Sequence, residues 1–413
     1  MKGGESDAGK PSGGKRKFYR DFLDTWTICS TQCGACFAHG PIVPHNFVEL
    51  PPPEWAPPLD KCPSYEYFKF RAYTAVARGD MAADINDDPD YSLSDDVMKV
   101  LYTCTGCGMC SEICYKLRPL TANLAIRDEL VERGARLPDP LPRIDAHVDE
   151  LGNIFGARKL ARSVEGLPTA GADLYFAGCV ARFQRPESLK ATTAILQKAG
   201  IEVAYLAEDE TCCGLIPGHD GNTAILEKKA AQNIDAFAKA GAKRVITSCA
   251  HCYKTLKVDY RLIAGELPFE VVHVAELFSQ LIDEKKIAFT RPLDEKVTYH
   301  DPCFLGRYCH VLEEPRKVLK SIPGVELVEM EPSGKWSHCC GSGMKITSAC
   351  YPEFTEAVTK KRLEQGKQAA DTVVTACTTC YQHMNRAATE AQIDLKVFDL
   401  PLVVATAMGI ELE

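Results

Sequence analysis

The sequence predicts an α/β protein in which one unit occurs twice in tandem, after a mainly helical region. Three observations support this fold class. From residue 171 onward, short β-branched strands alternate with polar-faced helices, which is typical of parallel sheets. Several cysteine-containing segments recur at a nearly constant spacing, which indicates a duplicated unit. Two further groups of cysteines precede the repeat and lie between helical patterns.

The composition is that of a globular protein with more than one core, because 46% of the 413 residues are hydrophobic and 25% are charged. The formal net charge of −8 argues against broad attraction to nucleic acid, so no nucleic-acid partner is expected. No apolar run is long enough to span a bilayer, and residues 1–18 predict a disordered tail without the apolar core of a signal peptide. We therefore expect a cytoplasmic protein, or one held at a membrane through a partner subunit.

The chain contains 20 cysteines, which is far more than a reduced cytosolic protein needs without metal. Most of them lie at short spacings, as the ligands of metal ions and iron–sulfur clusters do, whereas disulfide partners would be scattered. The cysteines therefore favour metal–sulfur ligation over disulfides.

Residues 19–136 are predicted to form a ferredoxin-like domain with two cubane [4Fe–4S] clusters. The run CTGCGMCSEIC has the C-x2-C-x2-C-x3-C spacing in which three cysteines wrap one cluster and the fourth reaches a neighbouring cluster. An earlier run, CSTQCGAC, is completed by a distant Cys62. By this cross-over rule, one cluster takes Cys29, Cys33, Cys36 and Cys114, and the other takes Cys62, Cys104, Cys107 and Cys110.

The region departs from the ferredoxin pattern at one position, and an alternative interpretation stays open. Pro63 follows Cys62 as the ferredoxin pattern requires, but Tyr115 follows Cys114 where that pattern has proline. Two structural zinc knuckles are the competing interpretation, although the region has one cysteine too many for each knuckle and lacks histidine ligands.

Residues 137–170 are interrupted by proline and glycine and predict a linker. The first unit then spans residues 171–290 and the second unit spans residues 291–413. ADLYFAGC in the first unit matches KVTYHDPC in the second, TCCG matches HCCG, and KRVITSCAHCY matches DTVVTACTTCY. Each cysteine group is expected at the carboxyl end of a strand, where open α/β sheets place their ligands.

Each unit offers five cysteines, including a vicinal pair followed by glycine. Five thiolates are one too many for a simple cubane cluster and exceed the four positions of tetrahedral zinc. A vicinal disulfide is the alternative, but it would leave the aligned C-x2-C pairs unexplained. The pattern therefore indicates an iron–sulfur centre of unusual shape in each unit. The first five are Cys179, Cys212, Cys213, Cys249 and Cys252, and the second five are Cys303, Cys339, Cys340, Cys377 and Cys380.

These motifs, above all YHDPCFLGR and HCCGSG, resemble the cysteine-rich CCG domains of heterodisulfide reductases. The preceding two-cluster module resembles the fused catalytic subunit of the membrane-associated enzyme, and the iron–sulfur subunits of anaerobic glycerol-3-phosphate dehydrogenase and glycolate oxidase share the arrangement. The resemblance implies that each set of five cysteines binds a noncubane [4Fe–4S] cluster. It also implies that a disulfide substrate is cleaved between the two clusters.

The resemblance thus predicts an oxidoreductase subunit that passes electrons through two cubane clusters to two noncubane clusters, which reduce or form a small disulfide. Electrons would be exchanged with a flavoprotein, a ferredoxin-type protein or a membrane b-type cytochrome. The alternatives are an electron-transfer subunit without its own substrate, linking a flavoprotein dehydrogenase to a quinone pool or b-type cytochrome, and a zinc-bound scaffold. Arg307 is expected to meet an anionic substrate group or to form a surface ion pair. His251, His300 and His338 lie beside cluster ligands in the sequence, so they are candidates to supply protons or to hydrogen-bond cluster sulfurs, with a purely structural role as the alternative.

Overall fold

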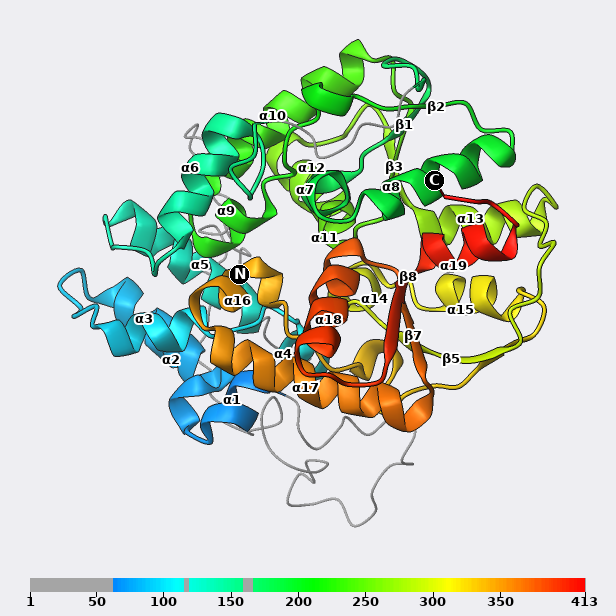
Figure 1. The fold of residues 1–413 in the computed structure, drawn as a ribbon. Coiled ribbons are helices and arrows are strands. Elements are labelled where there is room, and N and C mark those ends of the chain that lie inside the picture. Colours follow the sequence, from blue (N-terminus) through cyan, green and yellow to red (C-terminus); the bar gives the residue numbers. More distant parts are fainter. Residues whose placement is uncertain (1–61, 115–118, 159–165, 413) are drawn as a thin grey trace, which may run out of the picture.

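A computed structural model describes residues 62–114, 119–158 and 166–412. Cys29, Cys33 and Cys36 lie outside the described residues, and so does the tail predicted over residues 1–18. Figure 1 shows the described chain as one molecule in which the N-terminal helices lie beside two α/β units.

Both units contain a four-stranded parallel sheet, as the sequence predicts, and the two sheets have the same strand order. In the first unit the order is β2-β1-β3-β4, and in the second unit it is β6-β5-β7-β8. The fourth strand of each sheet was not expected from the sequence. The strands are β1 (Asp173–Tyr175), β2 (Val203–Ala204), β3 (Arg244–Thr247), β4 (Glu270–His273), β5 (Glu295–His300), β6 (Val325–Leu327), β7 (Thr372–Thr375) and β8 (Lys396–Asp399).

Helices connect these strands and cover the sheets, because each crossover between parallel strands needs one. The sequence predicts four helices in the repeat, and all four are found. PESLKATTAILQKAG contains α8, NTAILEKKAAQNIDAFAKAG contains α10, EEPRKVLKSIPG contains α15 and EFTEAVTKKRLEQG contains most of α17. The first unit contains α7 (Gly178–Phe183), α8 (Pro186–Lys198), α9 (Leu215–Asp220), α10 (Thr223–Lys239), α11 (Ala250–Lys254), α12 (Tyr260–Ala264) and α13 (Val274–Asp283). The second contains α14 (Cys303–Cys309), α15 (Glu313–Lys320), α16 (Ile346–Cys350), α17 (Pro352–Ala369), α18 (Thr378–Glu390) and α19 (Leu400–Ala407).

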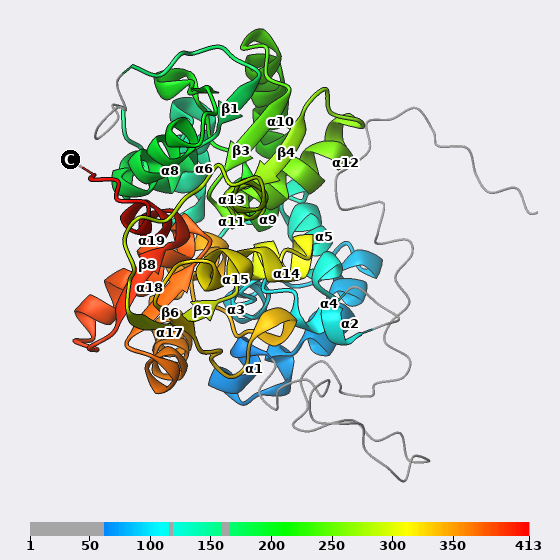
Figure 2. The ribbon, with the colours of Figure 1, turned by 90° about the vertical axis from the view of Figure 1, so that its right-hand side faces the viewer.

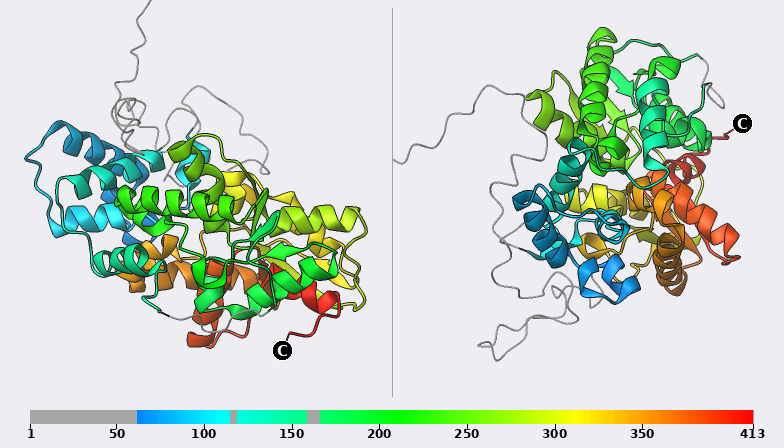
Figure 3. Two further views of the ribbon diagram at one scale, coloured as in Figure 1. Left: turned by 90° about the horizontal axis from the view of Figure 1, so that it is seen from above. Right: turned by 90° about the vertical axis from the view of Figure 1, so that its left-hand side faces the viewer.

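The N-terminal region is mainly helical and packs against both units (Figure 3). The hydroxyl of Ser94 caps its third helix by accepting a hydrogen bond from the backbone N–H of Val97. Arg127 is fully buried and joins this region to the first unit, because it donates to the carbonyls of Leu101 and His219. The helices are α1 (Pro63–Phe68), α2 (Ala75–Asp87), α3 (Asp95–Tyr102), α4 (Met109–Ile113) and α5 (Pro119–Glu132).

The segment expected to be a linker contains a helix, α6 (Leu141–Leu151). It packs against α9 and α10 of the first unit, and the carbonyl of Gly152 at its end accepts a hydrogen bond from the backbone N–H of Cys212. This helix therefore helps to hold one of the vicinal cysteine pairs in place.

The two units contact each other through equivalent elements, as Figure 2 shows with the first unit in green above the second in yellow to red. Helix α13 packs on α15, and its counterpart α19 packs on α8, the counterpart of α15. In the same way α11 packs on α14, and α18 packs on α7. Such reciprocal pairs are the signature of a two-fold arrangement. Helices α11 and α18 also touch each other, so they lie at the approximate two-fold axis.

Candidate metal centre

The strand order places the cysteines at one crevice in each sheet. The chain leaves β1 toward β2 and leaves β3 toward β4, in opposite directions, so the carboxyl ends of β1 and β3 border the point where open α/β sheets bind ligands. Cys179 follows β1 and Cys249 follows β3. In the second unit, Cys303 follows β5 and Cys377 follows β7. The expected position of these cysteines at strand ends is therefore observed.

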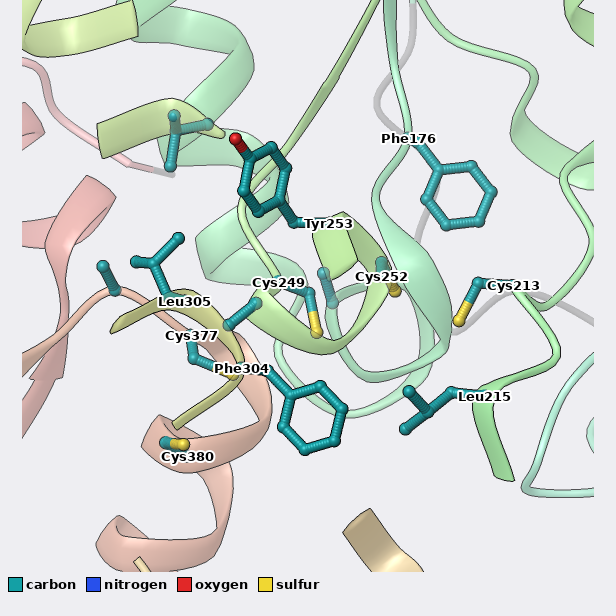
Figure 4. Packing of buried hydrophobic residues seen from close by; sticks show 14 of the residues in the cluster. Phe176, Cys213, Leu215, Cys249, Cys252, Tyr253, Phe304, Leu305, Cys377 and Cys380 are labelled. Carbon is teal, nitrogen blue, oxygen red and sulfur yellow. The ribbon is translucent and has the colours of Figure 1, made fainter. Parts of the chain in front are cut away.

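The ten cysteines of the two units form one continuous string of neighbouring sulfurs. Each thiol is in hydrogen-bond contact with the next, and every one of these residues is at most 9% exposed. Figure 4 shows five of them around the junction of the units. The order along the string is Cys179, Cys212, Cys213, Cys252, Cys249, Cys377, Cys380, Cys340, Cys339 and Cys303.

The middle of the string lies at the junction between the units. The thiols of Cys249 and Cys377 contact each other there, each at the N-cap of its helix. Adjacent hydroxyls also meet, because the Ser248 and Thr378 oxygens are 3.3 Å apart. The hydroxyl of Thr379 lies 3.5 Å from the sulfur of Cys249. The two sets of five cysteines are therefore in direct contact.

The vicinal pairs are free thiols, as are the other cysteines of the described residues. In each pair the first sulfur accepts a hydrogen bond from the N–H of the following glycine, over 3.4 Å from Gly214 to Cys212 and from Gly341 to Cys339. Both glycines have left-handed backbones, and a Cβ at Gly341 would lie 1.9 Å from the Thr359 hydroxyl. Glycine is thus required for the turn that follows each vicinal pair.

The thiols at the two ends of the string have pKa values that are shifted in the same direction and for the same reasons. The pKa of Cys179 lies well above its ordinary value because its thiol hydrogen-bonds to Cys212 and is buried. The pKa of Cys303 is raised for the same reasons, with Cys339 as the partner. Crowded, buried thiols of this kind need a positive centre to hold them together as thiolates.

Four cysteines of the N-terminal region lie around one cavity. Cys62, Cys104, Cys107 and Cys110 line it together with apolar side chains and with Arg78, an arrangement that suits the predicted second cubane cluster. Burial raises the pKa of Cys107 to about 11. Cys114 ends α4 and does not line this cavity, and the three cysteines predicted to share its cluster are outside the described residues.

This cavity lies against the second unit, and Arg307 makes the connection. Its guanidinium donates to the carbonyls of Cys107 over 2.6 Å, of Lys335 over 3.0 Å and of Ser337 over 2.6 Å. The neighbouring Tyr308 hydroxyl donates to the carbonyl of Gly106 over 2.7 Å. Arg307 is only 5% exposed, so the alternative of a surface ion pair was wrong, whereas its contact with an anionic substrate group stays a prediction.

The three histidines named from the sequence have different surroundings. His300 is buried, and one of its ring nitrogens lies within 4.8 Å of the sulfurs of Cys340 and Cys380. His251 is buried edge-on against Phe304, with ring centroids 4.6 Å apart. A ring nitrogen of His338 lies 3.0 Å from the Gln365 side chain. Burial lowers the pKa of His338 to about 4 and that of His300 well below its ordinary value.

Two cations near the sulfurs were not found from the sequence. Arg362 on α17 is fully buried and donates to His300 Nδ1 and to the Ser337 hydroxyl. Lys345 lies close enough to Cys340, Cys380 and Cys249 for their charges to interact. Neither residue belongs to a motif named from the sequence, although Lys345 stands two residues after HCCGSG. Only the left-handed backbone of Met344 (φ 60°) and Lys345 (φ 69°), visible in the structure, signals a strained functional segment.

The residues present suit iron–sulfur centres. All the candidate ligands are sulfurs, as such clusters require, and five per unit exceed what one zinc ion can bind. Two buried nitrogens beside the second set, Arg307 Nη2 and His300 Nε2, have no hydrogen-bond partner among the described residues. Unpaired N–H groups beside thiolates are the donors that cluster sulfurs accept from.

A separate hollow lies at the other end of the first sheet. Its lining includes Asp173, Glu202, Arg244 and Glu284, near the amino ends of β1 and β3. It is therefore remote from the cysteines, which follow the carboxyl ends of those strands.

In the described part of the chain, no helix combines the length and the apolar character that crossing a bilayer would need.

Comparison with known families agrees with this architecture. The cysteine-rich domain (CCG) family matches residues 174–257 and 297–385, one match in each unit. The 4Fe-4S dicluster domain family matches residues 26–116. Both matches fall on the segments that hold the cysteine groups.

Several characterised proteins are similar over most of the chain. The D subunit of the dihydromethanophenazine:CoB–CoM heterodisulfide reductase of Methanosarcina barkeri is 31% identical over 86% of this chain and 88% of its own length. The B subunit of the fumarate reductase (CoM/CoB) of Methanothermobacter marburgensis is 34% identical over 73% of this chain and 60% of that protein. The EtfAB:quinone oxidoreductase of Syntrophomonas wolfei is 31% identical over 79% of this chain and 49% of that protein.

Among solved structures, a hypothetical protein from Helicobacter pylori has a similar fold. The TM-score is 0.52, with 11% identity over 82% of this chain and 68% of that one. This likeness concerns the fold alone.

Proposed function

The chain belongs to the family of the heterodisulfide reductase D subunits and their iron–sulfur relatives, and from this premise we propose that it reduces or forms a small disulfide at the junction of its two units. It is an iron–sulfur electron-transfer subunit of the oxidoreductase type. The overall reaction would convert one disulfide, two electrons and two protons into two thiols.

The observation that carries this proposal is the contact between Cys249 and Cys377. A disulfide has two sulfur atoms, and its reduction needs two electrons. Two equivalent thiol sets that meet at one point could act on both sulfur atoms of one small molecule. The first noncubane cluster would be held by the five cysteines of the first unit, and the second by the five of the second unit. Bound clusters would supply one-electron transfers.

The chain's own residues would deliver and position the reactants. Arg307 and Tyr308 hold the Cys107 loop against the second unit, so electrons from the cubane cluster of Cys62, Cys104, Cys107 and Cys110 would arrive there. A second cubane cluster would be held by Cys29, Cys33, Cys36 and Cys114. Lys345 lies near cysteines of both units, so it would hold an anionic group of the substrate.

The partner we propose is a redox subunit: a flavoprotein, a ferredoxin-type protein or a membrane b-type cytochrome. This is supported by the relatives, several of which are named as subunits of redox complexes. We propose a cytoplasmic location, with any attachment to a membrane made through the partner.

The second candidate function is electron transfer without a substrate of its own, between a flavoprotein and a quinone pool or b-type cytochrome. It is favoured by the burial of the ten cysteines, each at most 9% exposed. The similarity to an EtfAB:quinone oxidoreductase also fits this function.

A thiol-release assay separates the two functions. The full chain, purified without oxygen and reduced, is mixed with the mixed disulfide of coenzymes M and B, and free thiols are counted. Disulfide reduction predicts two thiols per two electrons taken from the protein, and Cys340→Ala should abolish their release while the cubane spectra remain. Absence of thiols from a fully loaded protein that exchanges electrons rapidly with a flavoprotein would leave only the electron-transfer function.

A further inference from the structure

The two units are alike in fold but differ at one position beside the cysteines. Phe176 immediately follows β1 of the first unit, and the equivalent residue in the second unit is His300, the last residue of β5. Cys179 and Cys303, three residues further on, fix this correspondence. Both aromatic side chains are buried, and Figure 4 shows Phe176 near Cys213 and Cys252. One unit thus presents a hydrocarbon ring where the other presents an imidazole.

The hydrogen bonds of His300 determine where its ring proton lies. Nδ1 is 3.1 Å from Nε of Arg362, and because a guanidinium can only donate, Nδ1 accepts. The proton of the neutral ring is therefore on Nε2. This atom is buried and has no hydrogen-bond partner in the described parts of the chain. The ring lies beside the sulfurs of Cys340 and Cys380, so the Nε2–H group is available to an acceptor bound by these cysteines.

The buried cations reinforce this difference. Arg307 and Arg362 beside the second set donate only to neutral acceptors, and within the described residues neither has a carboxylate at ion-pair distance. In the first unit, Arg182 lies 3.7 Å from the carboxylate of Glu210, and both groups are buried. Arg182, near Cys179, is thus neutralised by an anion. Buried Lys229, which lies near Cys179 and Cys212, donates only to the carbonyl of Asp149 and the side chain of Gln232. Among the described residues, the first set therefore has one such unneutralised cation, whereas the second set has two, Arg307 and Arg362.

We propose that His300 donates an N–H···S hydrogen bond to the iron–sulfur centre of the second unit and that, together with Arg307 and Arg362, it gives this centre a higher reduction potential than the centre of the first unit. Hydrogen bonds to cluster sulfurs and positive charge nearby both stabilise an added electron. This inference rests on the proposed function insofar as both sets hold clusters. It assigns the first added electron to the second unit, which also contacts the Cys107 loop.

An exchange of the two residues tests this assignment. The full chain is loaded anaerobically and titrated with dithionite while the cluster signals are followed by electron paramagnetic resonance. His300→Phe should lower the potential of the higher-potential centre. At a fixed potential its reduced-to-oxidised ratio should fall at least tenfold, which is about 59 mV for a one-electron couple. Phe176→His should raise the potential of the lower centre. His300→Gln retains both an acceptor for Arg362 and an N–H donor, and should stay close to the wild type.

The outcomes are distinct. Unchanged potentials in His300→Phe, at wild-type iron and sulfide content, would overturn the inference, as would an equally large shift in His300→Gln. If His300→Phe loses its cluster, the Phe176→His variant provides the test. An unchanged reduction potential of the lower-potential centre in that variant would overturn the proposal. Failure of the proposed function would look different, because thiol release would be absent whatever the potentials are.

Discussion

The thiols of Cys249 and Cys377, which occupy equivalent positions in the two units, contact each other at the approximate two-fold axis. The pKa of Cys249 lies well below its ordinary value because its sulfur accepts hydrogen bonds from Cys252 and then from Cys377. The pKa of Cys377 is raised, first by burial and then by this same partner. The two sets of cysteines are therefore coupled through a single sulfur–sulfur contact.

Substitution at this contact should affect both centres. We expect Cys249→Ala to change the paramagnetic spectrum of the first centre and also to perturb the second, because the sulfur it removes contacts Cys377. Cys179→Ala, at the far end of the string, should change the first centre alone. A Cys249→Ala protein with an undisturbed second spectrum would contradict the coupling.

Loss of Cys62 should remove one cubane cluster. Its thiol lies in the same cavity as those of Cys104, Cys107 and Cys110, so Cys62→Ala leaves only three ligands there. We expect a loss of about four iron atoms per chain, which is one cubane cluster. Cys350→Ala is the matched control, since Cys350 is half-buried, outside that cavity and without a counterpart in the first unit. Iron and acid-labile sulfide analysis gives the answer.

Arg307 should anchor the N-terminal region to the second unit. Arg307→Ala leaves three carbonyls without their charged donor, and hydrogen bonds to charged groups contribute about 1.5–3 kcal/mol each. We expect the free energy of unfolding to fall by about 3 kcal/mol or more, measured by urea denaturation. Tyr308→Phe removes one neutral hydrogen bond and should cost about 1 kcal/mol. Equal effects of the two substitutions would argue against the anchoring role of Arg307.

Lys345 should influence substrate affinity more than turnover. For an anionic disulfide, Lys345→Ala is expected to raise KM about tenfold, corresponding to about 1.4 kcal/mol of lost interaction, with a smaller change in kcat. Lys367→Ala is the control, because this lysine is partly exposed on α17 and pairs with Asp371. An unchanged KM for the anionic substrate would remove Lys345 from the binding site.

A buried carboxyl on α6 makes the stability of the protein depend on pH. Burial raises the pKa of Asp145 from 3.8 to about 6. The folded protein therefore binds more protons than the unfolded chain between about pH 4 and pH 6, and the free energy of unfolding falls as the pH rises through this window.

Asp145→Asn removes the ionisable group but keeps an acceptor for Asn222. The variant should exceed the wild type in stability by about 2–3 kcal/mol at pH 7.5 and by almost nothing at pH 4. Thermal unfolding at the two pH values measures the difference, and an equal gain at both would rule out ionisation as its cause.

The sequence was sufficient for what local patterns encode. The β-branched segments of β3 and β7 and the helices α8, α10, α15 and α17 were predicted because apolar periodicity and helix end signals are local. The fourth strands β4 and β8 were missed, although they are as long as β3 and β7. The sequence predicted a linker where helix α6 lies, because proline and glycine interrupt that segment. These residues stand near the ends of α6, where they are compatible with a helix.

By itself, the sequence determined the duplicated α/β fold and the membership of ten cysteines in two equivalent sets, because spacing and repetition are properties of the chain. Only the tertiary structure decided how these sets face each other. The contact between Cys249 and Cys377, the burial of Arg307 under the Cys107 loop and the approach of Arg362 to His300 depend on the packing of the units. Such contacts join residues far apart in the chain, and no local pattern records which surfaces will be buried together.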